Sequence, residues 1–329
     1  MTTYILRRLL LIIPTLVGVT LLTFLLFRLA AGNAAEMKAA GGAMGGHPLS
    51  AEARKQTLEV LGLNKPPLVA YGDWLWRAVH GDLSDSQVDH RPVSEKIRER
   101  LPITMMLMGT SLILSYLLAI PLGVAAAIKR GQVLDRVISF IVFFLYSIPT
   151  FVAALILILL VAGGDYLNLL PSYGASSLTA SDMGPLAWAW DRALHMVLPV
   201  ICLTYASLAS ISRYTRVSMI EALSQDFIRT ARAKGLPEKV VIFRHALRNA
   251  LILIITLFAL DLPSLIGGAI IIEEIFSMPG MGQLIFQSID ARDEFTVMGI
   301  TLVAAVVTLL SYLLADILYV MVDPRISYE

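Results

Sequence analysis

Cysteine is almost absent from this 329-residue sequence, which contains one Cys and five His. A single thiol cannot form an internal disulfide, and Cys202 lies in an apolar run with no neighbouring Cys or His cluster to bind a metal. We therefore expect Cys202 to be a small buried apolar side chain. The Gly-Lys-Ser/Thr phosphate loop is also missing, so this chain is not itself a P-loop ATPase.

Charge is scarce as well. Only 16% of the residues are charged and 57% are hydrophobic, with a mean hydropathy of +0.74. These values lie outside the usual range of soluble proteins and predict a polytopic membrane protein. The formal net charge of +1 gives no argument for nucleic-acid binding, so the information lies in where the charges are placed.

Long apolar runs are what the sequence has in abundance. A bilayer core of roughly 30 Å needs roughly 20 apolar helical residues. Six such runs predict an all-α integral membrane protein with six transmembrane helices, and Pro149 should kink the third run locally. The first run follows Arg7 and Arg8 and could be a cleaved secretory signal, but it exceeds the roughly 7–15 residues of a signal core, so we expect a retained anchor. The runs cover about 9–29, 103–128, 137–162, 193–212, 250–272 and 297–322.

The distribution of Lys and Arg predicts the orientation. The loops 129–136 and 213–249 are rich in Lys and Arg and should be cytoplasmic, whereas the loops after the third and fifth runs are mostly acidic and should face outward. Both termini are then cytoplasmic. The acidic residues of the loop after the fifth run are Glu273, Glu274, Asp290, Asp293 and Glu294.

These predictions define a domain plan. An N-terminal transmembrane helix (1–30) precedes an extracytoplasmic segment (31–101), a transmembrane domain (102–322) and a cytoplasmic tail (323–329). The extracytoplasmic segment begins with a flexible "GGAMGG" stretch. Trp74 and Trp76 suit short helices that lie against the membrane or a partner, and a packed cap over the spans is an equal alternative.

Residues 221–252, "EALSQDFIRTARAKGLPEKVVIFRHALRNALI", are the most charged long stretch. Their apolar spacing predicts an amphipathic helix over 221–234 and a second helix over about 237–249. Gly235 should end the first helix in a left-handed C-cap, and Pro237 suits the first turn of the second. The apolar faces should contain Leu223, Phe227, Ile228 and Ala231 in the first helix, and Val240, Val241, Phe243, Ala246 and Leu247 in the second.

Two interpretations account for this polar island between apolar helices. A basic helix held at the interface by anionic lipid explains the charge. The tight Gly-Pro turn and the Glu221-Ala222 pair instead favour a knob that docks into a groove of a partner protein.

Glu221-Ala222, followed by Gly235 fourteen residues after Glu221 inside "DFIRTARAKGL" and then by "HALRNAL", resembles the coupling loop of ABC importer permeases. The likeness is greatest to the B-type permease subunits of the dipeptide/oligopeptide family, which have a type I (MetI-like) transmembrane domain. It extends over nearly the whole chain through "RPVSEKIRERLPITMML", "IPLGVAAAIKRG", "YSIPTF" and "GGAIIIEEIFSMPGMG".

The resemblance implies a permease subunit that forms half of a path for peptides or related small solutes across the cytoplasmic (inner) membrane. Its partners would be a second homologous permease, two cytoplasmic ATP-binding subunits, an extracytoplasmic solute-binding protein and membrane lipid, but no nucleic acid. We expect no catalytic residue, metal or cofactor in this chain, since ATP and Mg would bind to the partner subunits. The implied ATPase contact consists of Glu221, Ala222, Asp226, Arg229, Thr230, Ala233, Lys234, Gly235 and Leu236.

Asp261 lies within the fifth run, at a position where this family commonly has Gln. An ionised side chain at mid-bilayer costs roughly 2.5–3.5 kcal/mol, so Asp261 should face the protein interior or a water-filled path. It could line the translocation path and favour cationic or amine-bearing solutes, or it could pair with polar side chains or with backbone amides near Pro263. The alternative function is a proton-coupled secondary carrier that uses Asp261, but it leaves the coupling-like loop unexplained and the two halves show no obvious repeat.

Overall fold

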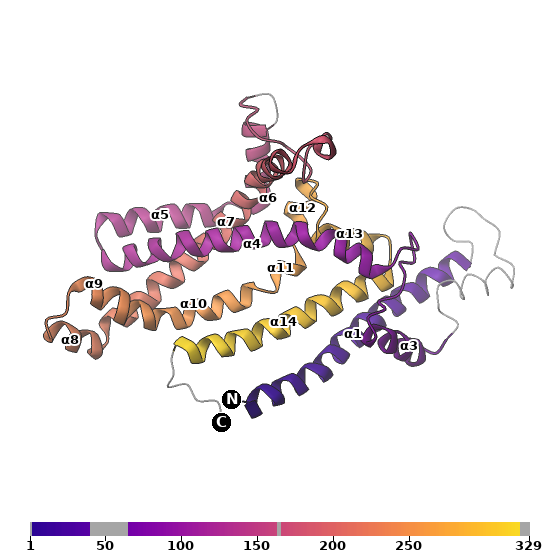
Figure 1. Cartoon of the computed structure of the whole chain (residues 1–329), viewed down its shortest axis with the longest axis horizontal. Coiled ribbons are helices and arrows are strands. Elements are labelled where there is room, and N and C mark those ends of the chain that lie inside the picture. Colours follow the sequence, from indigo (N-terminus) through magenta and orange to yellow (C-terminus); the bar gives the residue numbers. More distant parts are fainter. Residues whose placement is uncertain (1, 40–64, 163–165, 323–329) are drawn as a thin grey trace. The chain divides into compact units, whose positions relative to one another are not determined.

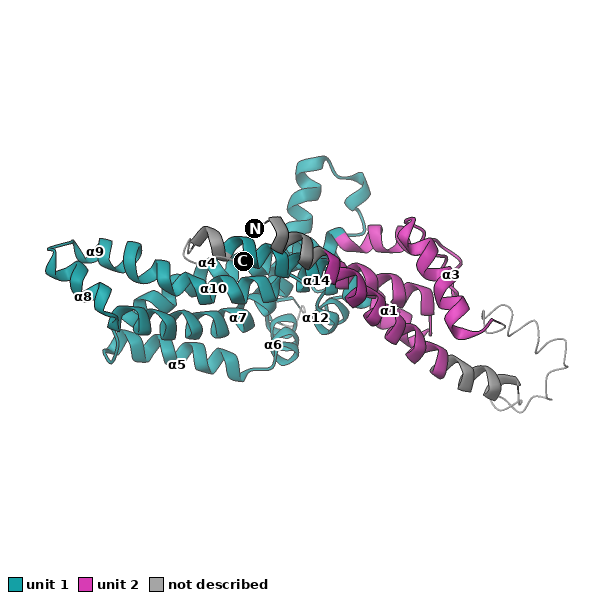
Figure 2. Cartoon of the chain, turned by 90° about the horizontal axis from the view of Figure 1, so that it is seen from below, with its two compact units in different colours: residues 1–5, 102–283, 307–329 teal, residues 6–101, 284–306 magenta. Residues whose placement is uncertain are grey.

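The computed structural model describes residues 2–39, 65–162 and 166–322 (Figure 1). Within these ranges the chain is helical, with one isolated antiparallel bridge between Asp85 and Pro92. It divides into two compact units (Figure 2): residues 1–5, 102–283 and 307–329 form unit 1, and residues 6–101 and 284–306 form unit 2. The predicted flexible "GGAMGG" stretch and the tail 323–329 lie outside the described residues.

Five helical stretches are long and apolar enough to cross a membrane, and a bent pair supplies the sixth. The bent pair consists of α5 (Val133–Ser147) and α6 (Thr150–Leu157), the latter continued by the π-helical turn η1 (Ile158–Ala162). These stretches confirm the six predicted spans. The five long ones are Leu10–Leu29 within α1 (Thr2–Ala39), α4 (Val93–Ile128), α7 (Pro185–Ser224), the interrupted run Glu238–Ile275, and Glu294–Leu318 within α14 (Glu294–Val322).

The third span bends at Pro149, as predicted, but α5 and α6 meet at 89°, which is a break of the span and not a local kink. Pro149 has no N–H to continue the α5 ladder and is the residue that precedes α6, with an extended ψ of 137° in place of a helical value. The Tyr205 hydroxyl, from α7, donates to the Ile148 carbonyl at 2.9 Å. This bond satisfies a backbone group that the break would otherwise leave without a partner in an apolar setting.

The fifth span is also interrupted. α10 (Leu247–Asp261) is followed by α11 (Ser264–Gly267) and α12 (Ile270–Ile275). The second break falls at Gly268, whose φ of +72° is in the region that favours glycine. A Cβ at this position would lie 2.5 Å from the Gly282 amide nitrogen, so a side chain is excluded by space as well.

The core of unit 1 is organised around α7, which packs against α5, α6, α10 and α12. Its buried side chains include Leu198, Cys202 and Met219. Cys202 is fully buried, as predicted. The long apolar helix α7 thus supports the bent pair along one part of its length and the polar segment after Ser224 at its C-terminal end (Figure 1).

Unit 2 has a small aromatic core formed by α1, by α3 (Pro67–Val79) and by the start of α14. Phe24, Tyr71, Trp74 and Met298 are buried together. The Tyr71 hydroxyl donates to the Val17 carbonyl at 3.0 Å and lies 2.9 Å from the Thr20 hydroxyl. Trp74 is fully buried, which matches a packed cap, whereas Trp76 is 70% exposed, as an interfacial aromatic would be.

Candidate functional site

The polar segment after α7 consists of α8 (Asp226–Ala233), α9 (Glu238–Val240) and the π-helical turn η3 (Val241–Ala246). Figure 1 shows α8 and α9 together at one end of α7 and α10. Gly235 has φ +75°, so the predicted left-handed C-cap is confirmed. Pro237 precedes the first residue of α9 with ψ 140°, one position earlier than predicted.

The structure does not contain the single helix predicted over 221–234. α7 continues to Ser224, and Gln225, with ψ 153°, separates it from α8. Ile228 and Ala231 are buried, as predicted, but Phe227 is 40% exposed. The break at Gln225 changes the direction of the helix, so residues on its two sides no longer share one face.

The buried face of the second helix differs from the predicted one by one residue. Val241 and Ala246 are buried as predicted, but Phe243 is 58% exposed and Ile242 is buried in its place. η3 is a π-helical turn, whose wider spacing turns the following side chains away from the positions that an α-helix would give them. Under α8, the resulting cluster unites Ala222, Ile228, Ala231, Val241, Ile242 and Ala246.

Eight of the nine residues predicted to contact an ATPase are exposed, and the exception, Ala222, packs in the cluster beneath α8. Within the segment, the Thr230 hydroxyl donates to the Asp226 carbonyl at 3.0 Å, and Arg229 lies 3.3 Å from the Asp226 carboxylate. Arg232 and Glu238 form an ion pair of 2.6 Å across the Gly235 turn. Their hydrogen bond raises the pKa of the Arg232 guanidinium. The segment therefore exposes polar side chains on one side, while its apolar side packs in the cluster beneath α8.

Asp261 is the last residue of α10 and is partly buried. The Tyr116 hydroxyl, from α4, donates to Asp261 Oδ2 at 2.8 Å, and the Tyr116 ring contacts Phe258 edge-on at a centroid distance of 5.4 Å. The Ser264 hydroxyl donates to the Asp261 backbone carbonyl, where α10 ends. The carboxylate thus has a polar side-chain partner next to the broken part of the fifth span.

Sequence reasoning missed the environment of Glu273, which was placed in an outward loop with Glu274. The Glu273 side chain is fully buried, and only Glu274 is exposed. Glu273 Oε1 accepts the Thr104 hydroxyl at 3.0 Å and the Ala269 amide at 3.2 Å, while Oε2 accepts the Gln283 amide at 2.9 Å. The carboxylate therefore ties α12 to the start of α13 (Met281–Asp290) and to α4.

Glycines make room for this carboxylate. A Cβ at Gly280 would lie 2.5 Å from both Glu273 Oε2 and the Thr104 hydroxyl, and one at Gly268 would lie 2.6 Å from Glu273 Oε1. The motif "GGAIIIEEIFSMPGMG" carries two features that could have indicated this cradle: a Glu directly after an apolar run, and glycines on both sides of it.

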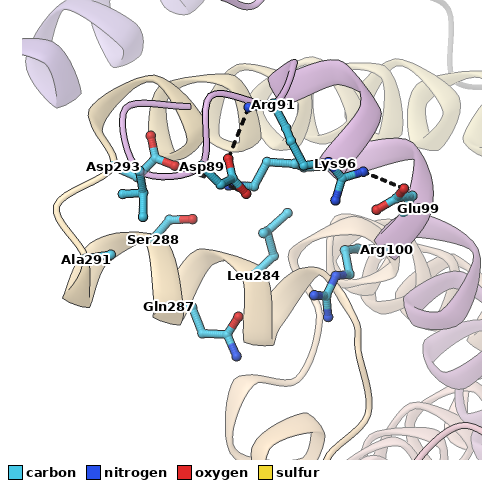
Figure 3. A pocket seen from close by; sticks show the side chains of 11 residues that line it. Asp89, Arg91, Lys96, Glu99, Arg100, Leu284, Gln287, Ser288, Ala291 and Asp293 are labelled. Atoms are coloured by element: carbon cyan, nitrogen blue, oxygen red, sulfur yellow. Dashed lines mark hydrogen bonds and ion pairs between the residues drawn. The ribbon is translucent and has the colours of Figure 1, made fainter. Parts of the chain in front are cut away.

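A polar cavity of about 210 Å³ lies within unit 2 (Figure 3). The Lys96 ammonium lies 3.1 Å from the Asp89 carboxylate and 3.3 Å from that of Asp293. Asp293 also accepts the Ser86 and Thr296 hydroxyls, and Arg91 pairs with Glu95 and Glu99. Asp293 and Glu294, expected on an exposed loop, are buried. The cavity is lined by Val88, Asp89, Arg91, Lys96, Glu99, Arg100, Leu284, Gln287, Ser288, Ala291 and Asp293.

These partners shift the acidities of the two aspartates. Burial by itself would raise the pKa of Asp89, but hydrogen bonds from Ser86 and Lys96 outweigh it and lower the pKa to about 2. The pKa of Asp293 is also lowered, because hydrogen bonds from Ser86 and Thr296 and the charge of Lys96 outweigh a larger burial. Both side chains are therefore held as carboxylates beside Lys96.

Six spans, two of them interrupted, define a multi-pass membrane protein with an exposed polar segment seated on the spans. Comparison with known proteins agrees. A family model described as the inner membrane component of binding-protein-dependent transport systems matches residues 119–328. The chain belongs to this family and is a permease subunit of an ABC importer, which selects that function over a proton-coupled carrier.

Curated relatives match along their full lengths. The chain is 41% identical over 329 residues to the oligopeptide transport system permease protein AppB of Bacillus subtilis, with 100% of both chains covered. It is 39% identical over 345 residues to the dipeptide transport system permease protein DppB of Escherichia coli K12, again with 100% of both covered. An inward-facing structure of the MetNI methionine ABC transporter aligns with a TM-score of 0.52 and 20% identity, covering 69% of this chain and 96% of that one, and shares the MetI-like fold.

Proposed function

We propose that this permease subunit imports peptides and that the exposed surface of α8 and the Gly235 turn receives the movement of a cytoplasmic ATPase. The peptide class rests on the full-length likeness to an oligopeptide and a dipeptide permease. The coupling role rests on one observation: eight of the nine residues expected at the ATPase contact are exposed on a segment whose opposite side is buried.

The packing of α8 against η3 suits the transmission of force. Ile228 and Ala231 fix the helix to Val241, Ile242 and Ala246, so α8 cannot move without the start of the fifth span. The segment also joins two of the most closely packed helices of unit 1, since α7 leads into it and α10 follows from it. A displacement of α8 is therefore passed to both helices, which are the elements that would reorient the translocation path.

The proposed assembly contains a second, homologous permease, two cytoplasmic ATP-binding subunits that hold ATP and Mg, and an extracytoplasmic solute-binding protein. Both termini would be cytoplasmic, because Lys and Arg gather in the turn between α4 and α5 and in the α8 segment. The outward surface then includes the cavity around Lys96, Asp89 and Arg91. Its mixed charges suit the docking of a polar surface of the binding protein.

Asp261 is the proposed determinant of solute charge on the path. Its carboxylate is partly exposed, and the hydrogen bond from Tyr116 at 2.8 Å would orient it. An Asp261→Asn substitution should then reduce uptake of amine-bearing solutes relative to neutral ones. Unchanged rates and an unchanged order of substrates would assign Asp261 to internal pairing alone.

The test of the coupling surface is purification of the chain from its native membrane in mild detergent, with mass spectrometry of copurifying proteins and an ATPase assay. We expect ATP-binding subunits and a second permease to copurify, and Lys234→Glu to abolish substrate-stimulated hydrolysis. Arg136→Glu is the matched control: it makes the same charge change at an exposed residue near the start of α5 and should leave hydrolysis unaltered. Equal activity of both variants would contradict a contact at the Gly235 turn.

A further inference from the structure

A second cavity, with a volume of about 590 Å³, lies in unit 1 between α5 and α7. Neither the proposed coupling surface nor Asp261 contributes to it. Apolar side chains form much of its wall, and hydroxyl groups and two arginines form the rest. The lining residues used below are Val142, Phe143, Tyr146, Val217, Arg213 and Arg216.

The two arginines have different electrostatic roles. Arg216 binds Asp135 through two hydrogen bonds, from Nε to Oδ1 at 2.6 Å and from Nη2 to Oδ2 at 2.8 Å. Asp135 also accepts the Gly131 amide at 2.8 Å and the Ser139 hydroxyl at 3.4 Å, so its acceptor capacity is used. Asp135 therefore neutralises Arg216 and leaves Arg213 uncompensated.

Arg213 is exposed, and none of the residues that the structure describes provides it with a carboxylate. It lies three residues before Arg216, which is about 4.5 Å along the axis of α7. The wall around it also carries the hydroxyls of Ser210, Ser212 and Tyr214, which can donate to an oxyanion. An unbalanced guanidinium beside hydroxyl donors is the chemistry that recognises a phosphate.

The remainder of the groove suits a hydrocarbon chain. Phe143, Tyr146 and Val217 are 69%, 63% and 51% exposed, although they lie on membrane-spanning helices. Basic pockets between transmembrane helices on the cytoplasmic side are sites where anionic lipid head groups bind. Two further exposed cations, Lys129 and Arg130, lie in the turn between α4 and α5 and add to the attraction for anionic lipid at this face.

We propose that the groove between α5 and α7 binds one anionic phospholipid, with its phosphate on Arg213 and the neighbouring hydroxyls and an acyl chain along Val142, Phe143, Tyr146 and Val217. The inference rests on the proposed orientation only for the choice of the cytoplasmic leaflet. A second permease subunit seated in the same groove is the competing occupant. The uncompensated charge of Arg213 in an otherwise largely apolar groove favours the lipid.

The experiment measures phospholipid retained by the full-length chain. Nanodiscs of phosphatidylcholine containing phosphatidylglycerol are formed around the chain, which is then re-extracted, washed in neutral detergent and analysed by lipid mass spectrometry. We expect phosphatidylglycerol to be retained in preference to phosphatidylcholine. Arg213→Gln should lower its retention about fivefold, the factor for one basic side chain near an anionic surface.

Two further variants separate the groove from general surface charge. Arg136→Gln removes an exposed cation that does not line the groove and should leave retention unchanged. Val217→Trp keeps every charge but fills the apolar part, so it should lower retention as Arg213→Gln does. Equal losses for Arg213→Gln and Arg136→Gln, or no preference for phosphatidylglycerol, would overturn the site.

The competing occupant is tested in the assembled importer. A cysteine introduced by Tyr146→Cys should crosslink to no protein, and the native Cys202 adds little background because it is fully buried. Efficient crosslinking to a second permease would assign the groove to subunit contact and overturn the lipid proposal. Lipid retention is read without ATP hydrolysis, so this result and that of the coupling experiment are independent.

Discussion

Two polar interruptions of apolar helices in unit 1 resemble each other in sequence but differ in structure. The first, around α8, has glycine at Gly235 and charged residues on both sides, and most of its charged side chains are exposed. The second, from Gly268 to Gly282, also combines glycine with acidic side chains, but Glu273 is fully buried and bonded by three donors. One segment presents its charges and the other encloses them.

The difference lies in the partners that the rest of the chain supplies. Thr104 and the backbone amides of Ala269 and Gln283 satisfy Glu273, so burial of its charge is tolerated. Around α8 the chain supplies apolar partners to Ile228 and Ala231 only, and Lys234 and Glu221 remain exposed. An enclosed polar segment holds the fold together. An exposed polar segment whose apolar side is packed against the fold is available to a partner.

The largest expected effect is that of Glu273→Ala. The substitution leaves the buried Thr104 hydroxyl and two partly buried amides without their acceptor, so the free energy of unfolding should fall by about 3 kcal/mol. The thermal midpoint of the purified chain in detergent measures the change. Glu274→Ala is the control, because Glu274 is exposed and its removal should change stability by less than about 0.5 kcal/mol. Equal midpoints for the two variants would contradict the role of the enclosed carboxylate.

The apolar packing beneath α8 is tested next with Ile228→Ala. Because Ile228 is fully buried in the cluster beneath α8, its truncation should cost about 2–4 kcal/mol. Phe227→Ala, at the adjacent and 40% exposed residue, should cost much less. Hydrogen exchange of peptides covering 221–249 should therefore accelerate strongly in the first variant alone. Faster exchange in the Phe227 variant would instead support the face predicted from the sequence.

The pair Phe227 and Ile228 also shows how far the sequence predicts this site. Apolar periodicity correctly placed a helix before Gly235 and buried Ile228 and Ala231. It could not reveal that the chain breaks at Gln225, since no proline or glycine lies there. The π-helical turn that buries Ile242 in place of Phe243 is likewise set by packing on α7 and leaves no local pattern.

Contacts between distant residues account for the other differences. Six spans could be predicted because hydrophobic length is a local property. At the 89° bend the Ile148 carbonyl is bonded by Tyr205, 57 residues away, and the buried Glu273 is bonded by Thr104, 169 residues away. Partners at such separations cannot be read from one sequence, so the magnitude of the bend and the place of Glu273 were both missed.

Glycine substitutions compare the two interruptions directly. In Gly280→Ala the new Cβ would lie 2.5 Å from Glu273 Oε2, and the forced repacking should cost about 1–3 kcal/mol. In Gly235→Ala the Cβ would meet no atom within 4 Å, so only the positive φ of +75° opposes it, at about 1 kcal/mol. Thermal midpoints should rank the two accordingly.

The cavity of unit 2 is an intermediate case, in which Asp89 is both exposed and paired with Lys96, and its variant should have the smallest effect. The folded-state pKa of Asp89 is about 2, below the usual 3.8, so the carboxylate stabilises the fold above pH 3.8 and this contribution is lost as the pH falls from 3.8 towards 2. Asp89→Asn should therefore flatten the decline of the thermal midpoint between about pH 5 and about pH 2.5.

Asp85→Asn, at a nearby exposed residue, should leave the slope of that decline unchanged. Because 41% of the Asp89 side chain is exposed, solvent screens its pairing with Lys96, and the difference in slope should be modest. Asp293 shares Lys96 and is 1% exposed, so most of the remaining acid sensitivity of unit 2 should stay in the Asp89 variant. Identical slopes for all three chains would mean that exposure outweighs pairing at Asp89, which would place it with the exposed charges of α8.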